Sequence, residues 1–452
     1  MTTPAIALTY AGALRALEER GRFGVRLGLG RTRALLDGLG HPERSVRGAL
    51  VAGTNGKGSV LALADSALRA AGYHVGSTPK PHLVSYRERV QLDGQPIEPA
   101  DFSRLVSRVL EVAAAIGRRH GEPTEFELLT ALVFARFAEA RPDVALVEVG
   151  LGGRLDATHA WDGGVAVVTN VDLDHTDLLG STLTAIAREK AAIIERGDLA
   201  VTGASGDGLA VIRRRARRLK VPLVEVEPAP LLGWDRDAIE VELPGLGPTR
   251  VGLRGRHQAA NVAIADATLD ALEEAGIATT PIEARRTGYA SAIWPGRLEL
   301  LQIAGRDVLL DGAHNPAGAA ALAIALDDLR PFLRDGPLTL LTASMADKDV
   351  DGVIAALGQS RSLSRATVVC TSLGLPRALS AEALATRWRA QQPGLAVVAE
   401  PEPRVALDRV LDGAVGGNGP LVVAGSLYLV GVARAHLVDD PDLRDPARAE
   451  DA

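Results

Sequence analysis

The sequence predicts a two-domain α/β protein in which mostly parallel strands alternate with helices. Apolar runs of strand length at 144–149 and 165–169 are separated by stretches with helical periodicity, such as 127–140 and 182–196. Strands and helices that alternate in this way form parallel sheets joined by crossover helices. A length of 452 residues exceeds what one hydrophobic core usually organises, so two domains are expected.

The first domain is expected to span residues 1–295 and to contain a P-loop-type, mostly parallel sheet. An Arg-rich helical segment leads into a strand at about 49–52, a glycine turn and a helix over about 59–71. Further elements follow in order: strands at 200–202 and 223–226, a Pro- and Gly-rich antiparallel excursion at 229–256, and a helix over 255–275. Ligands of such sheets bind at the carboxyl ends of the strands, where the glycine turns lie.

A smaller, Rossmann-like α/β domain is expected over residues 296–438, after the Trp-Pro-Gly-Arg sequence at 294–297. Its predicted elements are strands at 307–311, 338–342, 367–370, 396–398 and 420–424, and helices at 317–329 and 350–357. Residues 439–452 are charged and contain proline, which is typical of a flexible tail.

Composition excludes several classes of function. A formal net charge of −6 argues against a nucleic-acid partner, because binding a phosphate backbone requires a basic face. The single Cys370 excludes intramolecular disulfides and fits a reducing cytosol. Without a signal pattern, an apolar run of 18 residues or an exposed heptad stripe, we expect a soluble, cytoplasmic monomer.

Rare residues locate the chemistry. Only five of the 50 basic residues are Lys, and Lys57, Lys190 and Lys348 lie inside recognisable motifs. Asn is equally rare, and Asn55, Asn261 and Asn315 have similar surroundings. In a chain that uses Arg for its ordinary cations, Lys is expected where a compact ammonium or a nucleophilic amine is needed.

A phosphate-binding loop is predicted where the first strand turns into the following helix. The loop residues are Gly53, Thr54, Asn55, Gly56, Lys57, Gly58 and Ser59. Their backbone N–H groups and the helix N-terminus would cradle the phosphates of ATP, with Lys57 on the outer phosphates and Ser59 facing Mg²⁺. The spacing differs from the strict GxxxxGK[ST] pattern.

A metal site is predicted at two strand ends, taken to be adjacent, that carry Glu148 and His175. A carboxylate and an imidazole there could share Mg²⁺ between ATP and a second substrate. An ordinary ion pair for Glu148 and a surface position for His175 are the alternatives. Lys190 follows on the next helix and has two interpretations. With a lowered pKa it could react with CO₂ to give a metal-binding carbamate, and unmodified it would pair with phosphate.

Nine motifs, in order and at similar spacing, resemble the folylpolyglutamate synthase/dihydrofolate synthase branch of the Mur ligase superfamily. The similarity runs from about residue 8 to 435 and includes GTNGKGS (53–59), EVGLGGRLDAT (148–158), GRHQAANVAIA (255–265) and DGAHNP (311–316). It implies that Glu148, His175 and carbamylated Lys190 surround the metals. It also implies ATP-dependent amide formation through an acyl phosphate, with L-glutamate as the amine.

The resemblance also implies roles for the second domain. Arg297 lies at the hinge, Asp311 and His314 face the nucleotide, and Asn261 fits an adenine contact. Domain closure would then exclude water, which would otherwise hydrolyse the acyl phosphate. On residue types alone, an ordinary capped turn before a helix is the alternative for the sequence after Asp311.

Substrate recognition is expected around the Leu83–Arg89 loop. The predicted substrate-binding residues are His82, Arg87, Phe126, Asp156 and Ala157, with Phe126 as a stacking wall. Asp156-Ala157 resembles the pair that bifunctional members place against dihydropteroate, which favours dihydrofolate synthesis alongside polyglutamylation. One departure concerns Lys80, which stands where the family usually has a Ser near a metal. It would contact phosphate, or the ligand would shift to Thr78.

Three other functions compete with this hypothesis. A peptidoglycan ligase of the Mur type is disfavoured because the phosphate loop begins at residue 53, which leaves no room for a uridine-binding domain before it. A P-loop switch or a small-molecule kinase would not need a second domain with its own Asp and His. Lys80 is the sole support for a noncatalytic nucleotide-binding protein. A monofunctional folylpolyglutamate synthase is the alternative within the family.

Overall fold

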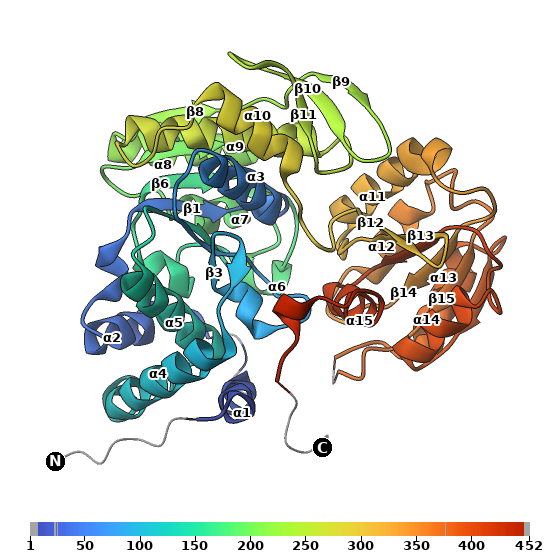
Figure 1. The fold of residues 1–452 in the computed structure, drawn as a ribbon, viewed down its shortest axis with the longest axis horizontal. Helices are drawn as coiled ribbons and strands as arrows, with labels where there is room; N and C mark the ends of the chain where they lie inside the picture. The colour runs from blue at the N-terminus through green and yellow to red at the C-terminus, as the bar shows by residue number, and fades with distance from the viewer. Residues whose placement is uncertain (1–7, 22–23, 25, 376, 447–452) are drawn as a thin grey trace. The chain divides into compact units, whose positions relative to one another are not determined.

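The computed structural model describes residues 8–21, 24, 26–375 and 377–446 (Figure 1). The chain divides into two compact units. Unit 1 comprises the chain up to Pro228, Ala260–Tyr289 and the chain from Pro441 onward, and unit 2 comprises Ala229–Ala259 and Ala290–Asp440. Every strand expected in the sequence is present, with ends that differ by no more than one residue.

The sheet of unit 1 has eight strands in the order β4-β3-β2-β5-β1-β6-β7-β8. Their bounds are β1 Gly48–Ala52, β2 Val75–Thr78, β3 Gln91–Leu92, β4 Gln95–Pro96, β5 Val144–Glu148, β6 Gly164–Val168, β7 Leu199–Thr202 and β8 Leu223–Glu225. In this spatial order, the pairings from β2 through β5, β1, β6 and β7 to β8 are all parallel. Strands β3 and β4 add an antiparallel edge next to β2. The expectation that the strands before Glu148 and His175 are neighbours is wrong, because β1 pairs with both β5 and β6.

Helices cover both faces of this sheet, and in Figure 1 α4 and α5 lie on one side, with α3 and α10 on the other. The helices are α1 Tyr10–Gly21, α2 Gly30–Gly38, α3 Lys57–Ala70, α4 Pro99–His120, α5 Glu125–Ala140, α6 Thr176–Leu179, α7 Leu183–Ala191, α8 Gly206–Leu219, α9 Gln258–Glu274 and α10 Ile282–Ser291. Short 3₁₀ turns are η1 Pro42–Ser45, η2 Tyr86–Arg89 and η3 Ala157–Ala160. Alternate residues of each strand point to opposite faces, so Leu50 and Ala52 join the core beneath α5 while Val51 is buried on the other face.

Helix α7 ends earlier than the expected helix over 182–196. Its last residue is Ala191, and the guanidinium of Arg215 on α8 donates hydrogen bonds to the carbonyl oxygens of Ala192 and Ile194. A side chain therefore satisfies carbonyl groups at the end of this helix.

Unit 2 contains a three-stranded antiparallel sheet and a six-stranded sheet. The first has the order β11-β10-β9, with β9 Leu231–Trp234, β10 Ile239–Leu243 and β11 Gly247–Val251, and agrees with the predicted excursion. The second has the order β12-β13-β17-β14-β15-β16: β12 Glu299–Ile303, β13 Arg306–Leu310, β14 Thr339–Thr342, β15 Thr367–Cys370, β16 Ala396–Ala399 and β17 Leu421–Ala424. Only β12 among these six strands is antiparallel to its neighbour.

The helices of unit 2 enclose the second hydrophobic core, which includes Trp388. They are α11 Pro316–Leu329, α12 Val350–Leu357, α13 Ala381–Gln391, α14 Pro403–Leu411 and α15 Leu427–Leu437, with a 3₁₀ turn η4 at Arg330–Phe332. Together with the four parallel pairings and the one antiparallel edge of the six-stranded sheet, they form the expected α/β layer arrangement.

The observed units differ from the expected ranges at both boundaries. Residues 229–259 belong to unit 2 although they precede 296, because their hairpin packs within that unit, where Trp234 donates to the carbonyl oxygen of Asp328. Residues 441–446 belong to unit 1, where Pro441–Leu443 forms a 3₁₀ turn, η5. Residues 441–446 of the expected flexible tail are therefore anchored by hydrogen bonds to unit 1.

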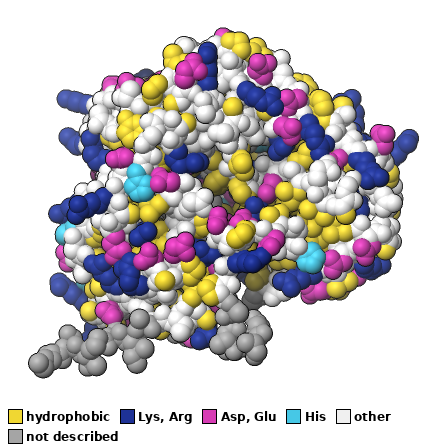
Figure 2. All heavy atoms as spheres, in the orientation of Figure 1, with side chains coloured by type: hydrophobic (Ala, Val, Ile, Leu, Met, Phe, Trp, Pro, Cys, Tyr) yellow, Lys and Arg dark blue, Asp and Glu magenta, His cyan; other side chains and the backbone are white. Residues whose placement is uncertain are grey.

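The surface agrees with the balanced composition. Figure 2 shows acidic and basic side chains interspersed over the visible face of the described residues, with apolar side chains between them. Within the part of the chain that the structure describes, no helix is both long enough and apolar enough to cross a bilayer.

Candidate active site

The predicted phosphate loop joins the end of β1 to the start of α3. Gly56 is the N-cap of α3 and has a φ of 83°, a left-handed conformation that favours glycine. The loop is fixed from β6: the N–H groups of Thr54 and Asn55 donate to Oδ1 of Asn170 at 3.1 and 2.9 Å, and Thr169 Oγ1 donates to the carbonyl oxygen of Asn55 at 2.7 Å. A helix N-terminus held in this way suits an anionic phosphate.

Close packing around the loop leaves no room for larger residues. A Cβ atom at Gly56 would lie 2.3 Å from Oδ1 of Asn261, the residue predicted to contact adenine. A Cβ at Gly53 would lie 1.8 Å from Oγ1 of Thr169. The glycines therefore permit the close approach of backbone that a phosphate cradle requires, and Asn261 lies directly against the loop.

Two of the rare lysines converge on the loop. Nζ of Lys57 donates to the carbonyl oxygens of Gly53 and Thr54 at 3.0 and 3.2 Å, and Nζ of Lys190 donates to Gly53 O at 2.8 Å. Burial, with Lys57 nearby, lowers the pKa of Lys190 to about 7. A substantial neutral fraction at neutral pH is the chemical requirement for reaction with CO₂.

Glu148 ends β5 beside the loop and is buried. Its Oε1 lies 4.0 Å from Nζ of Lys57, and its Oε2 accepts a hydrogen bond from the backbone N–H of Lys80 at 2.8 Å. Ser59, also buried, lies in the first turn of α3. Hydroxyl and carboxylate oxygens are the ligand types that Mg²⁺ prefers, so Ser59 and Glu148 fit such an ion by their chemistry.

The other predicted metal ligands do not come together with Glu148 as a cluster of His, Cys, Asp or Glu side chains in the described part of the chain. Across the described ranges, no group of three or more His, Cys, Asp or Glu side chains is arranged to hold a metal. His175 is the N-cap of α6 and has a left-handed conformation, with its side chain 42% exposed and its Nε2 3.8 Å from Asp174. A complete site would therefore draw on other oxygen donors, which is the role predicted for a carbamate on Lys190.

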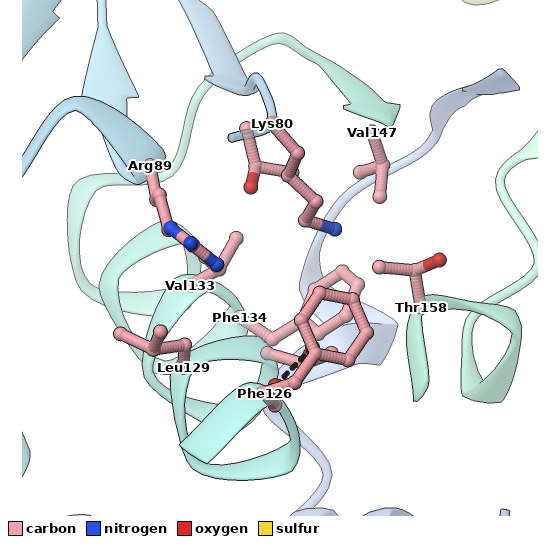
Figure 3. A pocket seen from close by; sticks show the side chains of 10 residues that line it. Lys80, Arg89, Phe126, Leu129, Val133, Phe134, Val147 and Thr158 are labelled. Carbon is pink, nitrogen blue, oxygen red and sulfur yellow. Dashed lines mark hydrogen bonds between the residues drawn. The ribbon is translucent and has the colours of Figure 1, made fainter. Parts of the chain in front are cut away.

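A pocket lies next to Glu148 (Figure 3). Its walls are mainly apolar and aromatic, with two cations: Thr78, Lys80, Arg89, Phe126, Leu129, Thr130, Val133, Phe134, Val147 and Thr158. Nζ of Lys80 lies 4.8 Å from the centre of the Phe126 ring and donates to the carbonyl oxygen of Glu148 at 2.6 Å. This combination suits a planar, apolar ligand that carries an anionic group.

The other predicted substrate residues have diverse positions. Asp156 is buried and accepts hydrogen bonds from Leu151 N, Thr158 N and Thr158 Oγ1, so its carboxylate shapes the turn that presents Thr158 to the pocket. Ala157, the first residue of η3, is buried. His82 accepts a hydrogen bond from Nε of Arg89 at 2.8 Å, and burial together with Arg89 lowers its pKa to about 3.

Arg87 does not line the pocket, whereas Arg89 does. The Arg87 guanidinium is buried and bonds to Ile97 O and to residues 442–445. The sequence predicts Arg87 as a substrate-binding residue, whereas Arg89 of the same loop is the arginine that lines this pocket. In the Tyr86–Arg89 turn, Arg89 contacts the Tyr86 ring at 5.7 Å, and this side-chain arrangement left no trace in the sequence pattern.

In unit 2, Asp311 and Arg297 come together with a histidine that sequence reasoning missed. The Asp311 carboxylate accepts from the backbone N–H groups of Leu298 and Ala313, both at 2.9 Å. Burial raises its pKa, which neighbouring Arg297 partly offsets, and burial lowers the pKa of His257 beside it. Nδ1 of His314 lies 2.7 Å from Gly312 O. The GRHQ sequence at 255–258, which contains His257, was the available signal.

A nucleotide-type loop, a paired lysine site and a second α/β unit with its own acid–imidazole cluster define an ATP-dependent ligase of the Mur type. The Mur ligase middle domain family matches residues 51–269, and the family described as dihydrofolate synthetase, C-terminal domain, matches residues 298–434. The chain belongs to the dihydrofolate synthase/folylpolyglutamate synthase family.

Curated relatives cover nearly the whole chain. A dihydrofolate synthase/folylpolyglutamate synthase of Bacillus subtilis (strain 168) is 33% identical over 438 residues, covering 95% of this chain and 99% of the relative. The Mycobacterium tuberculosis (strain ATCC 25618 / H37Rv) protein of the same name is 37% identical over 455 residues, covering 91% and 90%. The match therefore includes both units.

Solved structures show the same fold. Mycobacterium tuberculosis folylpolyglutamate synthase complexed with ADP and AMPPCP matches with a TM-score of 0.84 at 34% identity, covering 95% of this chain and 100% of that chain. E. coli FolC in complex with DHPP and ADP matches with a TM-score of 0.80 at 31% identity, covering 96% and 99%.

Proposed function

We propose that this ligase joins the carboxylate of dihydropteroate, or of a reduced folate, to the amine of L-glutamate at the expense of ATP. The observation that carries the proposal is the position of Glu148 between two sites. Its carboxylate lies 4.0 Å from Lys57 of the phosphate loop, and its backbone carbonyl accepts from Lys80 of the pocket. An acid held in the pocket would thus lie near the phosphates held by the loop.

The reaction follows from this arrangement. The substrate carboxylate attacks the γ-phosphorus of ATP, which releases ADP and forms an acyl phosphate. The glutamate amine then attacks the acyl carbon, phosphate leaves, and an amide results. Lys57 and the N–H groups at the start of α3 would stabilise the charge on the transferred phosphoryl group, while Lys80 and Arg89 would balance the anionic acid.

A bound Mg²⁺ would neutralise phosphate charge and orient the transferred group. Ser59 and Glu148 would hold it, with His175 and carbamylated Lys190 as further predicted ligands. The low pKa of Lys190, at about 7, supports formation of the carbamate. Arg297, Asp311 and His314 stay predicted nucleotide-binding groups of unit 2, and Asn261, which packs against Gly56, stays the predicted adenine contact.

Both activities of the bifunctional relatives are proposed for this chain. Support comes from the relatives of this name at 33% and 37% identity and from the pocket beside Asp156 and Phe126. A folylpolyglutamate synthase of Lacticaseibacillus casei, named for one activity, is 34% identical over 421 residues, so the monofunctional alternative needs a direct test. We further propose a cytoplasmic monomer, in keeping with the balanced surface and the single, buried Cys370.

The test is ADP release with MgATP and L-glutamate, with dihydropteroate and tetrahydrofolate supplied separately. Turnover with both, and products heavier by one glutamyl residue, is expected. Turnover with tetrahydrofolate alone would indicate the monofunctional enzyme, and no ADP release with either acid would refute the proposal. Lys57→Met should abolish nucleotide binding, whereas Lys220→Met, at the C-cap of α8, is the matched control and should leave turnover unchanged.

A further inference from the structure

The C-terminal segment, residues 441–446, forms hydrogen bonds with the loop that carries Arg89. Three of its residues contact the guanidinium of Arg87: Nη2 donates to Asp442 O at 2.6 Å and to Arg444 O at 3.1 Å, and Nε lies 3.3 Å from Oδ1 of Asp445. The same Asp445 oxygen accepts from Tyr10 Oη and from Ser85 Oγ, each at 2.7 Å. One carboxylate therefore joins α1, the loop and the C-terminal segment.

These contacts satisfy a charge that is otherwise deeply buried. Arg87 is only 3% exposed, and among the described residues its guanidinium has one further hydrogen bond, from Nη1 to Ile97 O at 3.1 Å. A buried guanidinium is tolerated only when its donors are paired, because desolvation of an unpaired charge is costly. If the segment left, Arg87 would have to turn toward water, and the loop around it would shift.

The loop transmits such a shift to the pocket. Glu88 accepts hydrogen bonds from the backbone N–H groups of Leu83, Val84 and Ser85, at 2.6 to 3.0 Å, which binds residues 83–88 into one rigid turn. Arg89 follows directly, lines the pocket, and hydrogen-bonds to His82 at the start of the same turn. A displacement of Arg87 therefore moves the cation that faces the acid substrate.

We propose that Asp445 is a positioning residue for the acid substrate: it anchors Arg87 and so keeps Arg89 in place on the pocket wall. The inference rests on the proposed function, since the pocket is taken to bind the pteroate-type acid. It assigns a role in substrate affinity to a segment that lies about 350 residues along the chain from the loop it holds.

The experiment compares full-length Asp445→Ala and Asp445→Asn with the wild type and with Pro446→Ala, an exposed neighbour in the same segment. KM and kcat are measured for the acid, ATP and L-glutamate, and amide hydrogen exchange is followed over residues 82–92. Asp445→Ala should raise KM for the acid by about tenfold, the size expected for losing one charge-assisted hydrogen bond, with kcat and KM for ATP nearly unchanged. Exchange over 82–92 should accelerate.

Asp445→Asn keeps an oxygen that accepts from Tyr10 and Ser85 but lacks the charge, so an intermediate KM is expected. Pro446→Ala should match the wild type in every measurement. Unchanged KM and exchange in Asp445→Ala would overturn the inference, as would equal losses for all three substrates, which indicate general destabilisation. If the wild type shows no turnover, the proposed function fails instead. The positioning role is then decided by amide hydrogen exchange over residues 82–92 and by the affinity of the variants for dihydropteroate.

Discussion

Gly56→Ala should weaken nucleotide binding through two effects that the structure separates. The residue has a φ of 83°, and an L-residue in that region costs about 1 kcal/mol. The new Cβ would also lie 2.3 Å from Oδ1 of Asn261, and relieving such overpacking costs roughly 1–3 kcal/mol. We therefore expect a loss of about 2–4 kcal/mol in unfolding free energy, by addition of these two terms.

Nucleotide affinity should fall as well, because relief of the clash moves the N–H groups that bind phosphate. A loss of one such contact corresponds to about a tenfold rise in Kd for ADP, measured by calorimetry. Gly72→Ala is the matched control: Gly72 follows the other end of α3 with a φ of 87° and nothing within 4 Å of its Cβ position. It should cost about 1 kcal/mol of stability and leave Kd unchanged.

The double variant Gly56→Ala/Asn261→Ala tests the steric term by itself. Removing the amide of Asn261 should recover about 1–2 kcal/mol of the Gly56→Ala penalty, as non-additivity between contacting residues. Strictly additive stabilities, or an unchanged Kd for ADP in Gly56→Ala, would refute the idea that this turn forms the phosphate cradle against Asn261.

Two further predictions concern the pocket and a buried carboxylate. Lys80→Met should raise KM for the acid about tenfold without changing Kd for ADP, because it removes an ammonium from the pocket wall. An unchanged KM would show that Lys80 is only structural. Burial and nearby Asp162 raise the pKa of Asp198 to about 7. Between about pH 4 and 7 the folded state therefore binds more protons than the unfolded state, so the free energy of unfolding falls as the pH rises through that window. Asp198→Asn should therefore stabilise the protein at pH 8 but not near pH 4, in denaturant titrations, and an equal gain at both values would contradict this.

Local sequence information predicted the strands well, for a physical reason. Buried parallel strands are continuous apolar runs bounded by glycine or polar residues, so β5 and β15 could be placed to within one residue. Strand order has no such local signal, and the placement of β1 between β5 and β6 was missed. The early end of α7 depends on Arg215, a contact from another helix.

Site residues could be proposed from the sequence where backbone geometry requires particular residue types, but not where tertiary contacts decide which side chain lies where. Gly56 and Lys57 were recognisable because a phosphate loop needs glycine and an ammonium at fixed spacing. The choice between Arg87 and Arg89 depends on residues 442–445, which are distant in sequence. A charged, Pro-containing terminus has the composition of a flexible tail. Composition does not reveal that Arg87, far away in the sequence, is buried and needs the carbonyl groups of this terminus as hydrogen-bond acceptors.

The scarcity of lysine acquires a structural explanation in unit 1. Lys57 and Lys190 both donate to the carbonyl oxygen of Gly53, at 3.0 and 2.8 Å, and Lys80 donates to the carbonyl oxygen of Glu148 at 2.6 Å. Three lysine amines thus gather at the carboxyl ends of the neighbouring strands β1 and β5. A planar guanidinium carries its donors in a wide, rigid fork, and two of them could not share one carbonyl oxygen in so small a space. Arginine could therefore replace lysine on the surface of this chain but not at these positions, where a compact amine is required beside the phosphate loop.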